Sequence, residues 1–271
     1  MAANPLRAAH RIARQDNRFL GWLFGRYIGG AKHPRGAILS AYRVARRELS
    51  RVLDSPPVAL EVVDNLNNAL LGATSAGLVA AIRHGAESAV AQVRAYTADG
   101  AIIDIAASVP DFTGYQSAIM GAFNAQRSIL RTMITAGAAS SLIIGDKSRL
   151  GVLKPGPVMF EAARWLATGM HDSFKASLIA PGWNKQAIPV FDEFTTECCL
   201  NVAGQIVPLD GKFHLTGTPR FADNMDWSPF HGHCRTSIAL YRADYDDGLT
   251  QAIEEDARRT RNAQILTNAL A

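Results

Sequence analysis

Cysteine and histidine side chains gather in the C-terminal third of the chain. Cys198 and Cys199 are adjacent, and His231, His233 and Cys234 follow in one short stretch. Thiolates and imidazole nitrogens are the ligands of structural zinc sites, where four of them converge on the metal. The candidate zinc ligands are therefore Cys198, Cys199, His231 and Cys234, and we expect no cofactor unless this cluster binds zinc.

The same side chains allow two other interpretations. Cys198 or Cys199, near the start of a predicted helix, would be a nucleophile of lowered pKa with His231 as its base. Such a pair also needs an orienting carboxylate and an oxyanion hole, and no motif in the chain identifies either. The third interpretation is structural, with the cysteines as small buried side chains and His231 bonded to the backbone.

Neighbouring residues are expected to build the module that carries this cluster. Arg235 is expected to pair with Asp192 or Asp226, and Gly204 and Gly211 are typical of turns. The aromatic residues expected in the module core are Phe221, Trp227 and Phe230.

The first 54 residues are strongly basic. They hold 11 Lys or Arg against 3 Asp or Glu, whereas the remaining residues hold 17 against 21. Helical spacing places arginines on the surfaces of two predicted helices, within residues 5–30 and 37–52. These arginines are Arg7, Arg11, Arg14, Arg18, Arg43, Arg46, Arg47 and Arg51. Because Arg donates to phosphate and carboxylate alike, they predict contact with nucleic acid or an acidic partner, with solvated faces and internal ion pairs as the alternative.

Composition excludes several classes of protein. With 271 residues, 48% of them hydrophobic, the chain can build one or two domains with real cores, which excludes wholesale disorder. Three cysteines exclude a disulfide framework and indicate a reduced, cytosolic history. Arginines run through the first 18 residues, so we expect no signal peptide. The net charge of +4 does not by itself indicate nucleic-acid binding.

Two stretches, residues 65–82 and 132–145, contain no charged residue and are rich in small side chains. We expect buried helices that pack closely. Because about 20 apolar residues can cross a bilayer, membrane insertion at some stage is the alternative.

Helical periodicity extends over much of the rest of the chain. Further helices are expected over residues 57–97, 112–139, 155–181 and 249–271. The first of these should be interrupted near Gly72 and Gly77. The last should place Ile253, Ala257 and Ile265 on its inner face.

Short strands are expected over residues 101–105, 187–191, 205–207 and 237–241. The predicted fold class is mainly α: a helical body with a small α+β C-terminal module and a terminal helix. The expected parts are a basic N-terminal helical arm (1–54), a helical body (55–182), the α+β module (183–241) and a C-terminal helix (242–271).

An ordered set of motifs runs from Lys185 to Arg235. A strand ends in Asp192 with Thr195 three residues later, and the motifs that follow are Cys198-Cys199, Gly204-Gln205-Ile206, Pro229, His231, Cys234 and Arg235. This order resembles the C-terminal module of the phage head-morphogenesis family, the minor head proteins similar to protein F of bacteriophage Mu. Two positions depart from the family pattern: Ser228 replaces its first proline, and the adjacent cysteines replace a C-x-x-C pair, which weakens a shared metal centre.

The resemblance implies a structural protein of the virion rather than an enzyme. Family members associate with the portal protein and with capsid or scaffold proteins, and assist head assembly, DNA packaging or DNA release. The implied location is the capsid interior or portal vertex, and the host cytoplasm during assembly, with packaged DNA as a further partner of the basic arm. The alternatives are a DNA-ejection protein that inserts residues 65–82 and 132–145 into a membrane, and a zinc or Cys-His enzyme.

Overall fold

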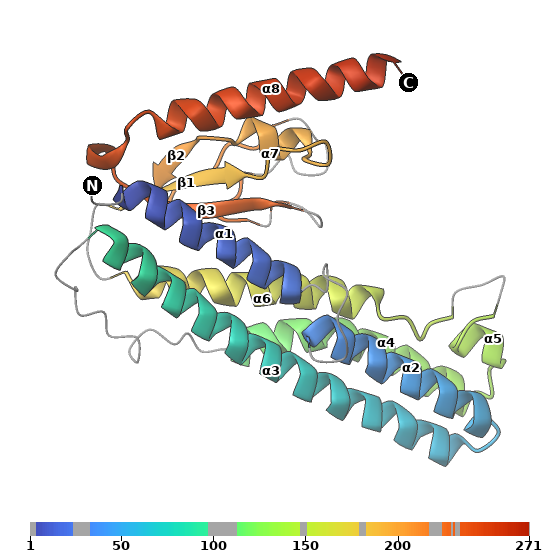
Figure 1. Cartoon of the computed structure of the whole chain (residues 1–271). Helices are drawn as coiled ribbons and strands as arrows, with labels where there is room; N and C mark the ends of the chain where they lie inside the picture. The colour runs from blue at the N-terminus through green and yellow to red at the C-terminus, as the bar shows by residue number, and fades with distance from the viewer. Residues whose placement is uncertain are drawn as a thin grey trace. The chain divides into compact units, whose positions relative to one another are not determined.

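The computed structural model describes residues 4–23, 33–96, 113–146, 151–178, 183–216, 224–228, 230 and 234–270. The helices, drawn in Figure 1, are α1 (Pro5–Leu23), α2 (Pro34–Val52), α3 (Pro56–Tyr96), α4 (Thr113–Thr135), α5 (Ser140–Ile143), α6 (Gly156–Ala176), α7 (Glu197–Asn201), the 3-10 helix η3 (Ala243–Tyr245) and α8 (Leu249–Leu270). The strands are β1 (Asn184–Pro189), β2 (Ile206–Pro208) and β3 (Thr236–Tyr241). The prediction of a mainly α chain with a small strand-containing module and a terminal helix is confirmed.

The chain divides into two compact units, each assembled from separate stretches. The unit that we call the module unit comprises Met1–Phe19, His84–Val109 and His171–Ala271. The other, the helical unit, comprises Leu20–Arg83 and Pro110–Met170. The sequence, in contrast, predicts four parts that are consecutive stretches of the chain. That four-part division stays a prediction.

Helix α3 runs through Gly72 and Gly77 without a break, so the predicted interruptions are wrong. A glycine inside a helix costs only about 1 kcal/mol relative to alanine, which packing along a long helix offsets. At Gly77 the packing needs the missing side chain, because a Cβ there would lie 2.9 Å from Cγ of Pro34 and 3.1 Å from Cδ2 of Leu166. Gly77 therefore lets α3 approach α2 and α6 closely.

A buried polar side chain connects several parts of the helical unit. The hydroxyl of Tyr42 on α2 donates to Oε1 of Gln126 on α4 at 2.6 Å. Nε2 of Gln126 donates to the carbonyl oxygens of Val152 and Lys154 at 2.7 and 2.8 Å. The helical unit also contains fully buried apolar side chains: Ile38, Leu49, Leu70, Leu78, Ile119, Phe123 and Leu130. Gln126 thus joins α2 and α4 to the segment that leads into α6.

The charge-free stretch 132–145 is not one helix. Helix α4 ends at Thr135, and Gly137 adopts a φ of 69°. The N–H groups of Gly137 and Ala138 donate to the carbonyl oxygens of Ile134 and Met133 at 3.1 and 2.9 Å, the pattern of a Schellman cap. Because half of the residues of this stretch are exposed and only Ile134 and Ile143 are buried, the prediction of a buried helix is wrong here.

Both faces of the antiparallel sheet, with β1 between β2 and β3, are covered. Ala187, Ile238 and Leu240 belong to the larger hydrophobic cluster of the module unit. Ile188 and Ala239, which point to the opposite face, belong to a smaller cluster. The strands predicted around residues 187–191, 205–207 and 237–241 are thereby confirmed, whereas residues 101–105 lie outside the described part of the chain.

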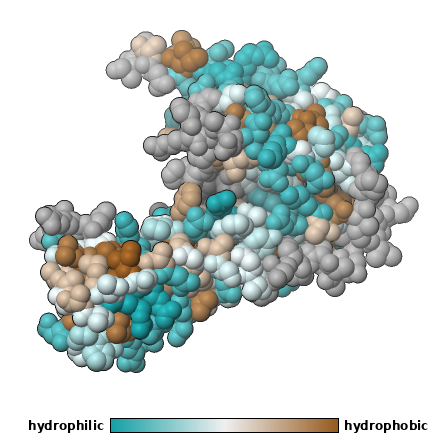
Figure 2. Space-filling model, turned by 180° about the vertical axis from the view of Figure 1, so that it is seen from behind, coloured by the Kyte–Doolittle hydropathy of each residue, from teal (hydrophilic) through white to brown (hydrophobic). Residues whose placement is uncertain are grey.

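Helix α8 lies along one face of the sheet (Figure 1). Ile253 and Ala257 are each 4% exposed and pack in the smaller cluster, as predicted. Ile265 is 60% exposed and Leu266 is 64% exposed, so the predicted inward position of Ile265 is wrong. Figure 2 shows hydrophobic surface next to the C-terminal end of this helix. Burial of the inner stripe of α8 therefore ends between Ala257 and Ile265.

Candidate functional site

Two motif residues from opposite ends of the module meet in the turn that follows β1. Nη1 of Arg235 lies 2.8 Å from Oδ1 of Asp192, and its Nη2 pairs with the other carboxylate oxygen. This bidentate pair confirms the predicted contact of Arg235 with Asp192. Asp226, the other predicted partner, accepts a hydrogen bond from Nζ of Lys175 at 2.9 Å instead.

The carboxylate of Asp192 also closes the turn itself. Its Oδ1 accepts the backbone N–H of Phe194 at 3.0 Å and the hydroxyl of Thr195 at 3.1 Å. Burial opposes ionisation, but the hydrogen bonds from Arg235, Phe194 and Thr195 hold the pKa of Asp192 below its usual value. The motif residues Asp192 and Thr195 therefore build a charged, hydrogen-bonded turn.

A side chain that the sequence prediction missed binds the same turn from α8. Nε2 of Gln264 donates to the carbonyl oxygens of Thr195 and Asp192 at 2.9 and 3.2 Å. One turn earlier, Nη2 of Arg261 donates to Oδ1 of Asn201 at the end of α7, at 2.6 Å. Helix α8 is thus tied to the motif by polar contacts as well as by its apolar stripe.

The cysteines are buried in the larger cluster, which confirms their interpretation as small core side chains. Sγ of Cys199 lies 3.8 Å from Sγ of Cys234, and the cysteines form no disulfide. The hydrogen bond with Cys198 lowers the pKa of Cys199, but Cys234 and burial raise it further, to about 11. Burial raises the pKa of Cys234, but hydrogen bonds from Cys199 and the backbone lower it to about 7.

These geometries bear on the metal and nucleophile hypotheses. Within the described residues, no group of three or more His, Cys, Asp or Glu side chains could hold a metal ion. Pro229, His231 and His233 lie outside the described residues, so zinc binding, which depends on His231, stays a prediction. A pKa near 11 keeps the Cys199 thiol protonated at neutral pH, which disfavours it as a nucleophile.

A buried lysine, also missed by the sequence prediction, occupies the centre of the module. Lys185 is fully buried, and its Nζ donates to the carbonyl oxygen of Leu209 at 2.6 Å. The same Nζ lies 4.9 Å from the ring centre of Trp227 and 5.5 Å from that of Phe213, within cation–π range. Burial lowers the pKa of Lys185 to about 8. The predicted core position of Trp227 is confirmed.

The other predicted core and turn residues can be placed in the same way. Phe230 is fully buried, as expected, whereas Phe221 lies outside the described residues. Gly204 adopts a φ of 78°, and a Cβ there would lie 2.9 Å from Cγ of Glu254 on α8. At Gly211 a Cβ would lie 2.9 Å from Cδ of Pro208. Both glycines therefore occupy positions where a side chain would disturb the turn.

The arginines expected on one face of the first helix are exposed on α1. Arg7 forms an ion pair with Asp247 at 3.2 Å, so internal pairing applies to it. Arg11, Arg14 and Arg18 form no ion pair with any described residue. These three guanidinium groups are available to a partner.

The arginines of the second predicted helix are Arg43, Arg46, Arg47 and Arg51, and all are exposed on α2. None forms an ion pair within the described part of the chain. Among the described residues, internal ion pairs therefore do not account for the charge of these four arginines.

Comparison with known proteins gives no family assignment. No protein-family model, curated protein or solved structure matches the chain. Of the helices in the described ranges, none combines the length and apolar character needed to cross a membrane.

Proposed function

We propose that the chain is a phage minor head protein, which joins the procapsid at the portal vertex or shell interior and assists head assembly, DNA packaging or DNA release. The resemblance of residues 185–235 to the head-morphogenesis family supports this proposal. The observation that carries it is the convergence of the motif residues in space. Asp192, Thr195 and Arg235 meet in one turn, and Cys199 and Cys234 meet in the core of the same unit.

Because the motif residues meet in space, they can act together to stabilise the module. The Asp192–Arg235 pair closes the turn after β1, and the thiols of Cys199 and Cys234 fill a buried space between α7 and the start of β3. Side chains used in this way maintain a small module whose surface can bind other proteins. The proposed role is accordingly non-enzymatic, with portal, capsid or scaffold proteins as partners.

Particle composition tests the proposal directly. Mass spectrometry of purified particles, both full and emptied of DNA, should detect the chain in full particles. Its retention after emptying would indicate a fixed head component, and its loss with the DNA would indicate a role in release. Absence of the wild-type chain from every particle contradicts the proposal.

Two matched variants connect particle entry to the module. Asp192→Ala removes the carboxylate of the motif turn and should deplete the chain from particles. Asp244→Ala removes another carboxylate paired with an arginine, Arg242 at 3.1 Å, but at an exposed site with no motif residue. The control variant should enter particles as the wild type does.

Packaged DNA is a further partner that the arginines of α1 would contact. Such contact would go to phosphates, would not depend on DNA sequence and would weaken with salt. Exchange of Arg7, Arg11, Arg14 and Arg18 for Ala should abolish retention on a DNA column at low salt. Exchange of Arg242 and Arg259, exposed arginines that are internally paired, should leave retention unchanged. Unchanged retention of the α1 variant would contradict DNA contact through this helix.

A further inference from the structure

One face of α2 carries three arginines and no carboxylate. The three are Arg43, Arg46 and Arg47, and all are exposed. Residues three and four apart on a helix share a face, so these arginines lie together. Ser50 continues the same face, and its hydroxyl donates to the carbonyl oxygen of Arg47 at 2.7 Å. We call Arg43, Arg46, Arg47 and Ser50 the arginine face of α2.

The opposite side of α2 is buried in the helical unit. Its side chains are each at most 4% exposed: Ile38, Tyr42, Ala45 and Leu49. Because this apolar stripe anchors the helix, the arginine face points away from the core of the unit.

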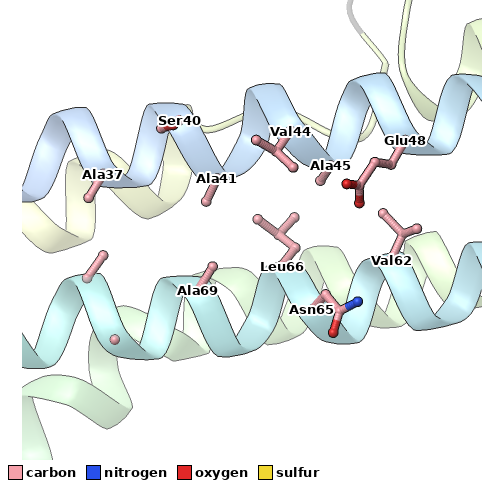
Figure 3. Close-up of a pocket in the computed structure, with 12 residues that line it drawn as sticks. Ala37, Ser40, Ala41, Val44, Ala45, Glu48, Val62, Asn65, Leu66 and Ala69 are labelled. Carbon is pink, nitrogen blue, oxygen red and sulfur yellow. The ribbon is translucent and has the colours of Figure 1, made fainter. Parts of the chain in front are cut away.

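The single carboxylate of α2 lies on another side of the helix. Figure 3 shows Glu48 pointing into the space between α2 and α3, beside Val44. This space is a groove of about 530 Å³. Val44 is the most exposed large apolar side chain of α2, at 41%. The arginine face therefore contains neither the carboxylate of the helix nor its exposed large apolar side chain.

The positive charges of the arginine face are not neutralised within the described part of the chain. Arg43, Arg46 and Arg47 form no ion pair with a described residue. Asp54, in the turn after α2, forms none either. Arg51 is not included in the face, because Glu48 and Glu61 line the same hollow.

The spacing of these charges opposes helix formation. Arg43 and Arg46 are three residues apart, and Arg43 and Arg47 are four residues apart. Like charges at these spacings repel one another on a helix. An anionic partner that lies along the face would remove this repulsion and supply the missing counter-charges.

We propose that the arginine face of α2 binds the phosphate backbone of duplex DNA, as a contact separate from that of α1. The arginines of α1 belong to the module unit, whereas α2 belongs to the helical unit. From Arg43 to Arg47 the helix rises about 6 Å, and phosphates of one DNA strand recur about every 3.4 Å along the duplex. Three guanidinium groups can therefore reach two or three successive phosphates. The choice of DNA among polyanions rests on the proposed function, whereas the anion-binding face itself does not.

The composition of the face favours DNA over an acidic protein. Stable protein interfaces place apolar or aromatic side chains at their centre and charges at their rim. The arginine face has guanidinium groups at its centre, while Val44 points into the groove with α3. Guanidinium groups donate paired hydrogen bonds to phosphate, and such contacts need no apolar surface.

A salt titration with the full-length chain tests this inference. The probe is a fluorescent duplex of about 30 base pairs, roughly three helical turns, whose binding is followed by anisotropy. Exchange of Arg43, Arg46 and Arg47 for Ala should weaken binding at least about tenfold at low salt. It should also reduce the slope of log affinity against log salt by about 2–3, since up to three phosphate contacts are lost. A duplex of unrelated sequence should give the same values.

Two control variants separate charge from fold. Exchange of the same three arginines for Lys keeps the charges and should keep the salt slope. Ala is a better helix former than Arg, so circular dichroism should show no loss of helix in the Ala variant. Arg131→Ala on α4 removes an exposed arginine whose charge Asp64 neutralises at 3.1 Å, and it should leave DNA binding unchanged.

Three results would overturn the inference. The first is an unchanged salt slope in the Ala variant, and the second is an equal loss of binding in Arg131→Ala. The third is binding of a Glu-rich helical peptide that the Ala variant loses while it still binds DNA as the wild type does, which would favour a protein partner.

The arginine exchange in α1 distinguishes this inference from the proposed DNA contact of α1. If only the α1 exchange weakens DNA binding, the α1 contact stands and the α2 inference is overturned. If only the α2 exchange weakens it, the reverse holds. With two or three phosphates, α2 alone makes too few contacts to retain the chain on a DNA column. Particle composition tests the virion role separately, because the titration uses no phage particle.

Discussion

The Asp192–Arg235 pair offers a quantitative test of how the motif stabilises the module unit. Each side chain is about one third exposed, at 32% and 33%. A bidentate charge-assisted pair at such a site should contribute about 1.5 kcal/mol, between the values typical of surface and buried pairs. The hydrogen bonds that Phe194 and Thr195 donate to the same carboxylate should contribute about 0.5–1 kcal/mol each. Asp192→Ala should therefore lower the free energy of unfolding by about 3 kcal/mol.

Asp192→Asn separates the two contributions. The amide oxygen can still accept hydrogen bonds from the turn, but the charge opposite Arg235 is gone, so the expected loss is about 1.5 kcal/mol. Combined with Arg235→Met in a double-mutant cycle, this variant should give a coupling energy of about 1.5 kcal/mol. Urea unfolding followed by tryptophan fluorescence measures each value, since Trp183 and Trp227 are buried in this unit.

The pH dependence of the same pair has a definite sign. The pKa of Asp192 is lowered in the folded chain, so the unfolded chain binds more protons at acid pH. The stability that this carboxylate contributes is present above the unfolded pKa, about 3.9, and is lost as the pH falls through the lower folded value. Wild type and Asp192→Asn should therefore converge in stability in strong acid. A coupling energy near zero, or equal losses for Asp192→Ala and the exposed control Asp244→Ala, would refute the reasoning.

Further predictions concern other buried groups. Tyr42→Phe leaves Oε1 of Gln126 without its 2.6 Å donor and should cost about 1–2 kcal/mol in thermal or urea unfolding, whereas an unchanged stability would show that the contact is dispensable. Because their sulfur atoms lie 3.8 Å apart, Cys199 and Cys234 should form a disulfide when the folded chain is treated with diamide, and peptide mapping should find this linkage in the wild type but not in Cys234→Ser. Burial lowers the pKa of His10 to about 4 from 6.5, so unfolding free energy should fall by up to about 3 kcal/mol between pH 6.5 and 4, and His10→Gln should lose this dependence.

Within the module, local sequence patterns predict individual strands and one ion pair correctly. The short apolar runs around Ala187 and Ile238 predict the strands β1 and β3. The sequence predicts Asp192 or Asp226 as the partner of Arg235 within the module. The structure selects Asp192 because Asp226 is held by Lys175.

Such patterns do not predict the hydrogen bonds that side chains donate to backbone carbonyl oxygens. Gln264 binds the carbonyl oxygens of the Asp192 turn, and Lys185 binds that of Leu209. Carbonyl groups are present at every residue, so a sequence does not mark which of them accepts a side-chain donor. The same limit applies to Ile265, whose helical spacing predicts an inward face but not the point at which the covered surface ends.

The glycines of α3 show a related limit. Residues 65–82 contain no charge and are rich in small side chains, and the sequence predicts that this helical stretch packs closely. Gly77 fulfils that expectation, whereas Gly72, five residues earlier on the same helix, borders open space. The difference arises from the neighbours, since Pro34 and Leu166 lie against Gly77 and nothing lies within 4 Å of a Cβ at Gly72.

The proposed assembly role can be compared with the distribution of reactive and charged groups in the described part of the chain. The carboxylate of Asp192 and the thiols of Cys199 and Cys234 are engaged in contacts that hold the module together. The guanidinium groups that form no ion pair with a described residue, such as those of Arg14 and Arg47, lie in contrast on exposed faces of α1 and α2. Catalysis needs reactive groups that reach a substrate, whereas assembly needs a stable module and charges that are paired only in the complex. The proposed assembly role predicts the second arrangement, and the DNA-retention experiment on α1 and the particle experiment on Asp192 test that role at different parts of the chain.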